Sequence, residues 1–380
     1  MFSLRPVKGE SFINREKLME DIMYDLKNSF TGYALYGRRR IGKTSIFKEV
    51  QRRLEEEEDI VAVYFSVWDL MNDKLSNFIR DFTVAVLDAY KHHLTLKYKA
   101  RNLLKASFSL LKEILRELNI SIKIKDEVEF LLSFDESKAN YDKLVEDCWN
   151  LPEELAKETN TKCVLLIDEF PALMNLKDGK KVGESFIKKI RTIHEDQEHV
   201  VLCISGSIRH TMKIVTINPA SAFYGQFIVK EVGPLEKKYA SELLIKNLSY
   251  ISEDAIDEVY DFSRGIPFYV QFLGKIMEKR ERITLAAVKE AEDEFIEEEG
   301  DIVFKDNFDN LGSKEREVLV AIAKGLQTPS KIAKEIKTVP NAISVYLGYL
   351  EEKGYIAKKE KGFYVIEDPV FENWLKRKVL

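Results

Sequence analysis

The feature that most constrains this chain is its segment 37–44, Gly-Arg-Arg-Arg-Ile-Gly-Lys-Thr, which fits the pattern G-x-x-x-x-G-K-[ST] at every fixed position. A short apolar run at 32–36 precedes it, and a helix-forming segment at 45–54 follows it. Glycines let the backbone approach a phosphate without a clashing Cβ, and the N–H groups of the following helix attract anions. The pattern therefore predicts a strand, a phosphate-binding loop and a helix. An ordinary glycine turn beside a solvated run of arginines is the alternative.

The loop pattern assigns roles to individual residues. Lys43 should reach the terminal phosphates of ATP, and the Thr44 hydroxyl should take one position on Mg²⁺. The residues that we expect to contact the nucleotide here are Gly37, Arg38, Arg39, Arg40, Ile41, Gly42, Lys43, Thr44 and Ser45.

Composition limits the remaining possibilities. The chain has 380 residues, 45% of them hydrophobic and 32% charged, which predicts two or three globular domains. Its net charge of -5 gives no overall attraction to nucleic acid, so any such contact must be local. Cys148, Cys163 and Cys203 stand among apolar neighbours and are expected to be buried reduced thiols. No apolar run reaches the length of a membrane span and no signal-peptide pattern is present, so we expect a cytoplasmic protein without membrane contact.

The second strong signal is the apolar run 163–167, which ends in two adjacent carboxylates, Asp168 and Glu169. Acids at the end of a buried parallel strand are costly unless they serve a ligand. Beside a phosphate loop, Asp168 is placed to hold Mg²⁺, directly or through water. Glu169 is placed to orient or deprotonate the attacking water, so Glu169 and Lys43 are the candidate catalytic residues.

Two further apolar runs, 60–67 and 200–204, also predict strands buried on both faces of a parallel sheet. The second ends in Ser-Gly-Ser, so Ser205 or Ser207 could sense the γ-phosphate, and a simple strand-to-loop turn is the alternative. Between the two runs, residues 75–119 favour helix. Alternation of apolar and polar residues over 120–132 predicts a small hairpin.

Near the N-terminus, Asn14 could cap a helix that carries Leu18, Ile22 and Leu26 on one face. From 236 to about 299 the pattern is helical, with Pro267 suited to a first helical turn. The acidic span 290–309 is expected to join domains.

The last segment, 313–380, predicts three helices and a hairpin, which together make a winged helix-turn-helix. Ser313 should cap the first of these helices. The hairpin tip carries Lys358, Lys359 and Lys361, where contact with DNA phosphates is natural. The expected recognition helix has no Arg or Lys before Lys353, which is poor equipment for reading bases. Sequence-independent DNA contact and contact with a protein partner therefore both stay open.

Taken together, these motifs resemble the archaeal P-loop ATPase family of the AAA+/STAND superfamily. The resemblance rests on 12–18, 37–45, Leu-Ile-Asp-Glu-Phe at 166–170, Gly-Ile-Pro at 265–267 and Asp-Pro-Val-Phe at 368–371 with Trp374. It implies an α/β fold, with a P-loop core of AAA+ type built on a parallel sheet, a helical lid and a C-terminal winged helix-turn-helix. The implied domains are 1–232, 233–305 and 306–380.

The resemblance also implies further nucleotide contacts. In AAA+ ATPases the segment that matches 12–18 lies against the adenine, which makes Phe12, Ile13 and Arg15 candidate base contacts. Pro267 becomes a candidate nucleotide contact at the lid. Such proteins often have Tyr-Gly-Arg where this chain has Tyr-Gly-Gln, ending at Gln226. If that arginine reads the γ-phosphate, hydrolysis here should be slow, or Arg209 should substitute.

Three functions agree with these residues. The first is a regulatory switch that binds and hydrolyses ATP with Mg²⁺. The second is a DNA-binding initiator or regulator similar to the origin-recognition ATPases, although their Gly-Asp-x-Arg lid motif is replaced here by Gly-Ile-Pro at 265–267. The third is a scaffold that holds nucleotide, contacts proteins and turns over little. No Asn-Lys-x-Asp guanine motif is present, which argues against a GTPase, and no motif identifies the signal, the partner or the oligomeric state.

Overall fold

The computed structural model of the chain describes residues 2–94, 114–118, 120–134, 140–206, 222–360 and 362–380. The chain divides into two compact units. The sheet unit comprises residues 6–38 and 42–232, and the helical unit comprises residues 1–5, 39–41 and 233–380. The further division of the helical unit at residue 305 stays a prediction.

The sheet unit is built on five parallel strands. They are β1 (Gly32–Tyr36), β2 (Ile60–Ser66), β3 (Lys162–Asp168), β6 (Val200–Gly206) and β7 (Phe227–Glu231), and their order across the sheet is β2-β3-β6-β1-β7. Every residue of β6 and nearly every residue of β3 is buried, as the continuous apolar runs predict for central strands. The strands predicted at 32–36, 60–67, 163–167 and 200–204 are confirmed.

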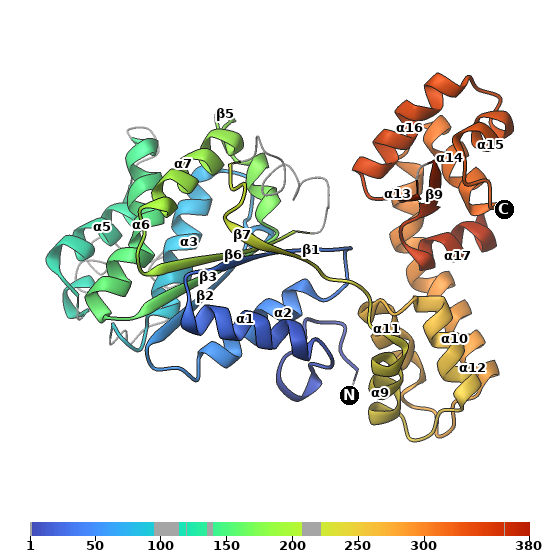
Figure 1. Cartoon of the computed structure of the whole chain (residues 1–380), viewed down its shortest axis with the longest axis horizontal. Coiled ribbons are helices and arrows are strands. Elements are labelled where there is room, and N and C mark those ends of the chain that lie inside the picture. The colour runs from blue at the N-terminus through green and yellow to red at the C-terminus, as the bar shows by residue number, and fades with distance from the viewer. Residues whose placement is uncertain (1, 95–113, 119, 135–139, 207–221, 361) are drawn as a thin grey trace. The chain divides into compact units, whose positions relative to one another are not determined.

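Helices cover both faces of this sheet. Figure 1 shows α1 and α2 on one face and α3, α6 and α7 on the other. Their bounds are α1 (Glu16–Asn28), α2 (Lys43–Leu54), α3 (Leu75–Ala89), α5 (Ile122–Ser133), α6 (Tyr141–Thr159) and α7 (Gly183–Glu195). Short elements complete the unit: the 3₁₀ turns η1 (Gly9–Ser11), η2 (Val67–Asp69) and η4 (Phe170–Asn175), and the strands β4 (Lys177–Asp178) and β5 (Lys180–Lys181).

Aromatic packing on the α3 face fixes helices to the sheet. Phe82 of α3 stacks on Trp149 of α6 with ring centroids 5.2 Å apart, and Phe65 of β2 meets Phe78 and Phe82 edge to face. The three cysteines are buried and free, as predicted, and burial raises the pKa of each thiol to about 12.

Three local predictions are wrong. Residues 122–133 form the helix α5 rather than a hairpin, because the buried residues are Ile124, Val128, Leu131 and Leu132, a helical spacing. Asn14 does not cap α1, since Arg15 holds the cap position with φ of 81° and no side-chain cap bond. Likewise, α14 begins at Ser313, and Gly312 occupies the cap position without a side-chain bond.

The helical unit contains two groups of helices. The first group is α9 (Lys237–Asn247), α10 (Glu253–Ser263), α11 (Pro267–Met277) and α12 (Leu285–Glu294). The π-helix η6 (Phe295–Lys305) and α13 (Asp306–Asp309) continue α12 without a break, so the acidic span expected to join domains is helical. The second group is α14 (Ser313–Ala323), α15 (Pro329–Glu335), α16 (Pro340–Glu352), the hairpin of β8 (Ile356–Glu360) and β9 (Phe363–Ile366), and α17 (Pro369–Lys378).

The last helix, α17, is bound to both groups. Asp368 caps it by accepting hydrogen bonds from the N–H groups of Val370 and Phe371, and also accepts one from the Tyr269 hydroxyl of α11. The Trp374 indole donates to Asp301 of η6 at 2.6 Å. These contacts give the terminal Asp-Pro-Val-Phe stretch a structural role within the helical unit. No helix in the described ranges is both long and apolar enough to cross a membrane.

Candidate functional site

The phosphate loop follows β1 and leads directly into α2, as predicted. Gly42 holds the N-cap position of α2 with φ of 99°, a conformation that L residues with a Cβ rarely adopt. Gly42 provides no side-chain cap at this end, and the N–H groups of a first helical turn attract anions. Lys43 is 4% exposed, and its ammonium donates to the carbonyls of Gly37 and Arg38, both at 3.0 Å. The loop is therefore folded around this lysine.

Asp168 lies at the centre of a group of hydroxyls. Thr44 Oγ1 donates to Asp168 Oδ2 at 2.6 Å, and Tyr64 Oη donates to the same oxygen at 3.1 Å. The other oxygen, Oδ1, accepts hydrogen bonds from the Ser205 hydroxyl and from the N–H of Glu169. The carboxylate is 2% exposed and is held by side chains from α2, β2 and β6.

Strand order explains why these residues meet. Because the strands are parallel, their carboxyl ends lie at one edge of the sheet, where the loop after β1 also begins. In the register of β2 on β3, Tyr64 lies opposite Leu166, and Ser66 lies opposite Asp168. Tyr64 and Asp168 are therefore diagonal neighbours on one face, within reach of a long side chain.

The donor set fits a magnesium ion. Thr44 and Asp168 offer a hydroxyl and a carboxylate oxygen 2.6 Å apart, both hard ligands. Mg²⁺ is usually bound by one or two carboxylates together with substrate phosphates rather than by a full protein cage. Among the described residues, no group of three or more His, Cys, Asp or Glu side chains is arranged to hold a metal.

Backbone strain gathers at the segments predicted to bind nucleotide. Asn14, Arg15, Arg40 and Glu169 have φ of 67°, 81°, 66° and 52°, in the left-handed region that residues other than glycine seldom occupy. Each such residue costs about 1–3 kcal/mol, and such conformations cluster at ligand sites. Glu169 occupies the turn between the end of β3 and the 3₁₀ turn η4. Its side chain is half-buried, and it directly follows Asp168 in the chain.

The segment before Phe12 is attached to α2. The N–H of Val7 donates to Ser45 Oγ at 3.2 Å, and the N–H of Gly9 donates to Glu49 Oε2 at 2.7 Å. Glu49 is 1% exposed and also accepts hydrogen bonds from Arg52 and Arg53.

The charge state of Glu49 follows from these bonds. Burial alone would raise the pKa of Glu49, but hydrogen bonds from Arg52, the Gly9 backbone and Arg53 outweigh it and lower the pKa to about 2. The hydrogen bonds of Val7 and Gly9 fix residues 7–9 to α2, the helix that begins at Lys43. The candidate base contacts Phe12 and Ile13 follow this segment directly, and both are half-buried.

One predicted position lies elsewhere. Gln226 directly precedes β7, whose first residue pairs with Gly32, the first residue of β1. Gln226 therefore lies at the amino end of the strands, and the length of β1, about 13 Å, separates this end of the sheet from the loop. Its amide donates to Glu195 at the end of α7 at 2.9 Å. Gln226 thus lies away from the loop of its own chain, and slow hydrolysis or substitution by Arg209 stays a prediction.

Other predicted residues belong to other parts of the chain. Ser207, Arg209 and Lys361 lie outside the described residues, so their roles stay predictions. Pro267 occupies the first position of α11, as predicted, and its nucleotide contact stays a prediction.

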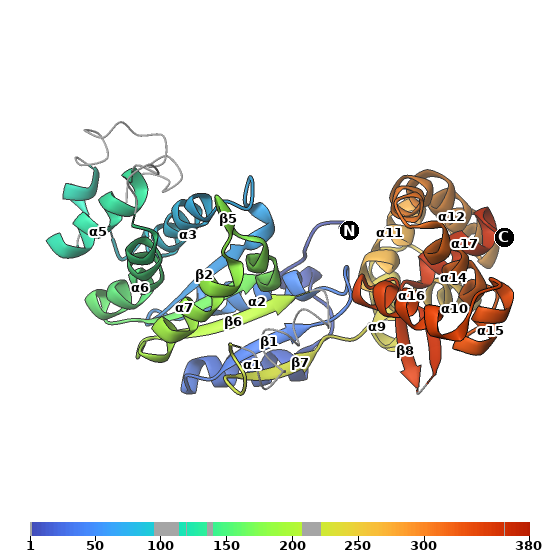
Figure 2. The same cartoon turned by 90° about the horizontal axis from the view of Figure 1, so that it is seen from above.

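The C-terminal segment has the predicted order of three helices and a hairpin. The hairpin of β8 and β9 projects from the helices in Figure 2, and it carries Lys358 and Lys359 exposed on β8. The exposed residues of α16 include Ser344, Val345 and Tyr349. This surface offers apolar contact, and the first cation along the helix is Lys353 at its C-cap, 4.5 Å from the centroid of the Tyr349 ring, so the preceding turns of α16 have no cation for reading bases.

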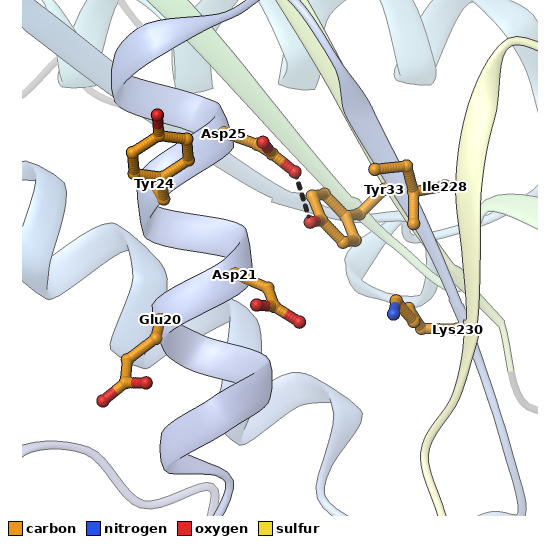
Figure 3. A pocket seen from close by; sticks show the side chains of 7 residues that line it. All are labelled: Glu20, Asp21, Tyr24, Asp25, Tyr33, Ile228 and Lys230. Atoms are coloured by element: carbon orange, nitrogen blue, oxygen red, sulfur yellow. Dashed lines mark hydrogen bonds between the residues drawn. The ribbon is translucent and has the colours of Figure 1, made fainter.

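A hollow of about 370 Å³ lies away from the predicted site, between α1 and β7 (Figure 3). Glu20, Asp21 and Asp25 of α1 line one side and Lys230 of β7 lines the other, Asp21 points toward Lys230, and the Tyr33 hydroxyl donates to Asp25 at 2.6 Å. None of the residues predicted to bind nucleotide lines it.

Tyr64 is the residue of this site that sequence reasoning missed. It stood within an apolar run that predicted only a buried strand. A polar hydroxyl near the carboxyl end of an apolar strand could have pointed to Tyr64. That observation becomes informative only once β2 is known to lie beside β3. Burial and the Asp168 carboxylate raise the pKa of Tyr64, so its hydroxyl stays protonated and donates.

Solved structures support this description of the fold. A Walker-type ATPase of Pyrococcus abyssi is 18% identical, covers 99% of each chain and superposes with a TM-score of 0.72. The ORC2 protein of Aeropyrum pernix is 13% identical, covers 98% of this chain and 97% of its own, and has a TM-score of 0.55. At these identities the likeness shows the fold.

Sequence comparison adds a relative and a family. An uncharacterised protein of Methanocaldococcus jannaschii is 25% identical over 373 residues, which cover 94% of this chain and 66% of that relative. The family described as an ATPase domain predominantly from Archaea matches residues 12–273, which contain both the loop and the Asp-Glu pair. This match extends over more than half of the sequence, and the chain therefore belongs to that family of archaeal ATPase domains.

Proposed function

We propose that this chain binds ATP with Mg²⁺ at the phosphate loop and hydrolyses it, and that it works as a regulatory switch of the AAA+/STAND type. The observation that carries the proposal is the group around Asp168, where the loop residue Thr44 and the strand residues Tyr64 and Ser205 converge on one carboxylate. Family membership supports ATP as the nucleotide.

The proposed chemistry divides among the residues of this chain. Lys43 binds the terminal phosphates, and the N–H groups at the start of α2 face the same anion. Thr44 and Asp168 hold the metal, which neutralises phosphate charge when it is bound. Glu169 orients the attacking water and accepts its proton. Phe12, Ile13 and Arg15 contact the base, and Pro267 contacts the nucleotide from α11.

Glu169→Gln tests this assignment. The amide keeps the size of the side chain but cannot accept the proton, so hydrolysis should slow on the order of a hundredfold or more while Mg-ATP affinity is retained. Phosphate release gives the rate and calorimetry gives the affinity. Glu195→Gln is the matched control, because it makes the same change at a residue outside the proposed site. Glu195 is the last residue of α7 and lies shortly before the amino end of β6, whereas the site is at the carboxyl ends of the strands. Equal rates for wild type and Glu169→Gln would move the catalytic role elsewhere.

A second candidate function is that of a scaffold that holds nucleotide and contacts another protein. Val345 and Tyr349 are exposed on α16, whose residues Pro340–Glu352 include no Arg or Lys, and the first cation is Lys353 at its C-cap, over the Tyr349 ring. This favours protein contact over specific DNA readout by this helix. Turnover measured with and without DNA separates the candidates. A switch should hydrolyse ATP in both conditions, a DNA-dependent regulator should respond to DNA, and a scaffold should show little turnover in either.

A further inference from the structure

Tyr64 holds the Asp168 carboxylate from a strand that the phosphate-loop pattern does not include. Its hydroxyl reaches Oδ2 at 3.1 Å, the same oxygen that accepts from Thr44, while Ser205 donates to Oδ1. A carboxylate is free to turn about its Cβ–Cγ bond, because that torsion has only a broad preference. Donors on both oxygens, from strands on either side of β3, fix the plane of the carboxylate.

The tyrosine ring is itself held in place. The Lys48 ammonium of α2 lies 5.4 Å from the centroid of the Tyr64 ring, one helical turn after Thr44. The same helix therefore supplies Thr44 to the carboxylate and Lys48 to the ring. The hydroxyl donates to Asp168, whose carboxylate oxygens accept hydrogen bonds.

We propose that Tyr64 is a positioning residue for the metal site, whose hydroxyl keeps Asp168 oriented when Thr44 engages a divalent cation bound with ATP. In the described structure, Thr44 and Tyr64 both donate to Asp168 Oδ2. The loop pattern assigns the Thr44 hydroxyl to the metal, and a hydroxyl oxygen that turns to a metal no longer holds Asp168 in the same way. The Tyr64 hydroxyl then continues to donate to Oδ2. The inference rests on the proposed function, since it concerns the metal of that same site.

The effect should appear in metal affinity and not in nucleotide affinity. Residues that orient metal ligands change metal affinity about 10- to 100-fold when they are mutated. The carbonyls of Gly37 and Arg38, which accept from the Lys43 ammonium, belong to the loop and not to β2, so loss of the Tyr64 hydroxyl should leave this lysine in place. A residue that merely filled space beneath the loop would disturb both affinities together.

The test uses the full chain in a Glu169→Gln background, so that ATP is not consumed. Electron paramagnetic resonance measures the affinity of the protein–ATP complex for Mn²⁺, a spectroscopically visible substitute for Mg²⁺. Calorimetry in EDTA measures ATP affinity without metal. Tyr64→Phe removes only the hydroxyl. Tyr33→Phe is the matched control, because it removes another tyrosine hydroxyl of the same sheet, which donates to the Asp25 carboxylate of α1.

We expect Tyr64→Phe to weaken Mn²⁺ binding about 10- to 100-fold, with metal-free ATP affinity unchanged, and Tyr33→Phe to change neither. Unchanged Mn²⁺ affinity in Tyr64→Phe would overturn the inference and leave the proposed function standing. An equal loss of metal-free ATP affinity would also overturn it, because it would reveal a structural role. A parent protein that binds no Mn²⁺ with ATP would refute the proposed function itself.

Discussion

Glu49 gives a quantitative prediction about how the N-terminal segment is attached to the helix after the phosphate loop. Its carboxylate is buried and accepts hydrogen bonds from Gly9, Arg52 and Arg53, which lower its pKa from an ordinary 4.5 to about 2. Since the folded pKa is below the unfolded value, ionised Glu49 stabilises the fold above pH 4.5. That contribution is lost as the pH falls from 4.5 toward 2.

The size of the contribution follows from the shift. Each pKa unit corresponds to about 1.4 kcal/mol, so the shift corresponds to about 3 kcal/mol. Arg52 and Arg53 remain partly in water, which screens their charge, so about 2 kcal/mol is the better expectation. Glu49→Gln should therefore lower the free energy of unfolding by about 2 kcal/mol at pH 7. The difference from wild type should shrink steadily between pH 4.5 and pH 2.

Urea unfolding followed by tryptophan fluorescence measures this difference. Trp68 and Trp149 belong to the sheet unit and Trp374 to the helical unit, so a Trp374→Phe background restricts the signal to the unit that contains Glu49. Glu184→Gln is the matched control, because Glu184 pairs with Lys188 at the surface of α7 and should give no measurable difference. A wild-type-to-Glu49→Gln difference that is the same at pH 7 and pH 3 would refute this account of the buried carboxylate.

Three other predictions concern nucleotide and DNA. Lys43→Ala should weaken ATP binding about 10- to 150-fold in calorimetry, because a charge-assisted hydrogen bond contributes about 1.5–3 kcal/mol. Unchanged affinity in a folded variant would disprove the loop assignment. Gln226→Arg should leave the rate of phosphate release unchanged, since Gln226 lies at the amino edge of the sheet; a faster rate would show that it acts on a nucleotide. Alanine at Lys358, Lys359 and Lys361 should abolish salt-sensitive DNA binding in fluorescence anisotropy, and specific binding that survives would contradict the role of these lysines.

Sequence reasoning succeeded where one pattern had one structural meaning. Continuous apolar runs at 60–67 and 163–167 could only be buried strands beside a phosphate loop, and both are. It failed at 120–132, where isoleucines at alternate positions suit a strand, while Ile124, Val128 and Leu131 also recur with helical spacing. Short apolar patterns of this kind do not decide between the two periods, and packing against α3 and α6 does.

The site was predictable only where residues are close in sequence. The loop and the Asp-Glu pair each form a continuous motif, so their residues could be named in advance. Tyr64 and Ser205 reach Asp168 through the neighbouring strands β2 and β6, a relation that depends on strand order. Gln226 shows the same limit, because a motif position does not reveal at which end of the sheet a residue lies, and the pairing of β7 with β1 places Gln226 at the amino end.

The most direct test of the central claim is a crystal structure of the Glu169→Gln variant with ATP and Mg²⁺. The account predicts the triphosphate in the loop at 37–44, the Lys43 ammonium within hydrogen-bond distance of the terminal phosphates, and the metal on the Thr44 hydroxyl beside Asp168. Nucleotide bound elsewhere, or bound in the loop with the metal away from both Thr44 and Asp168, would contradict it.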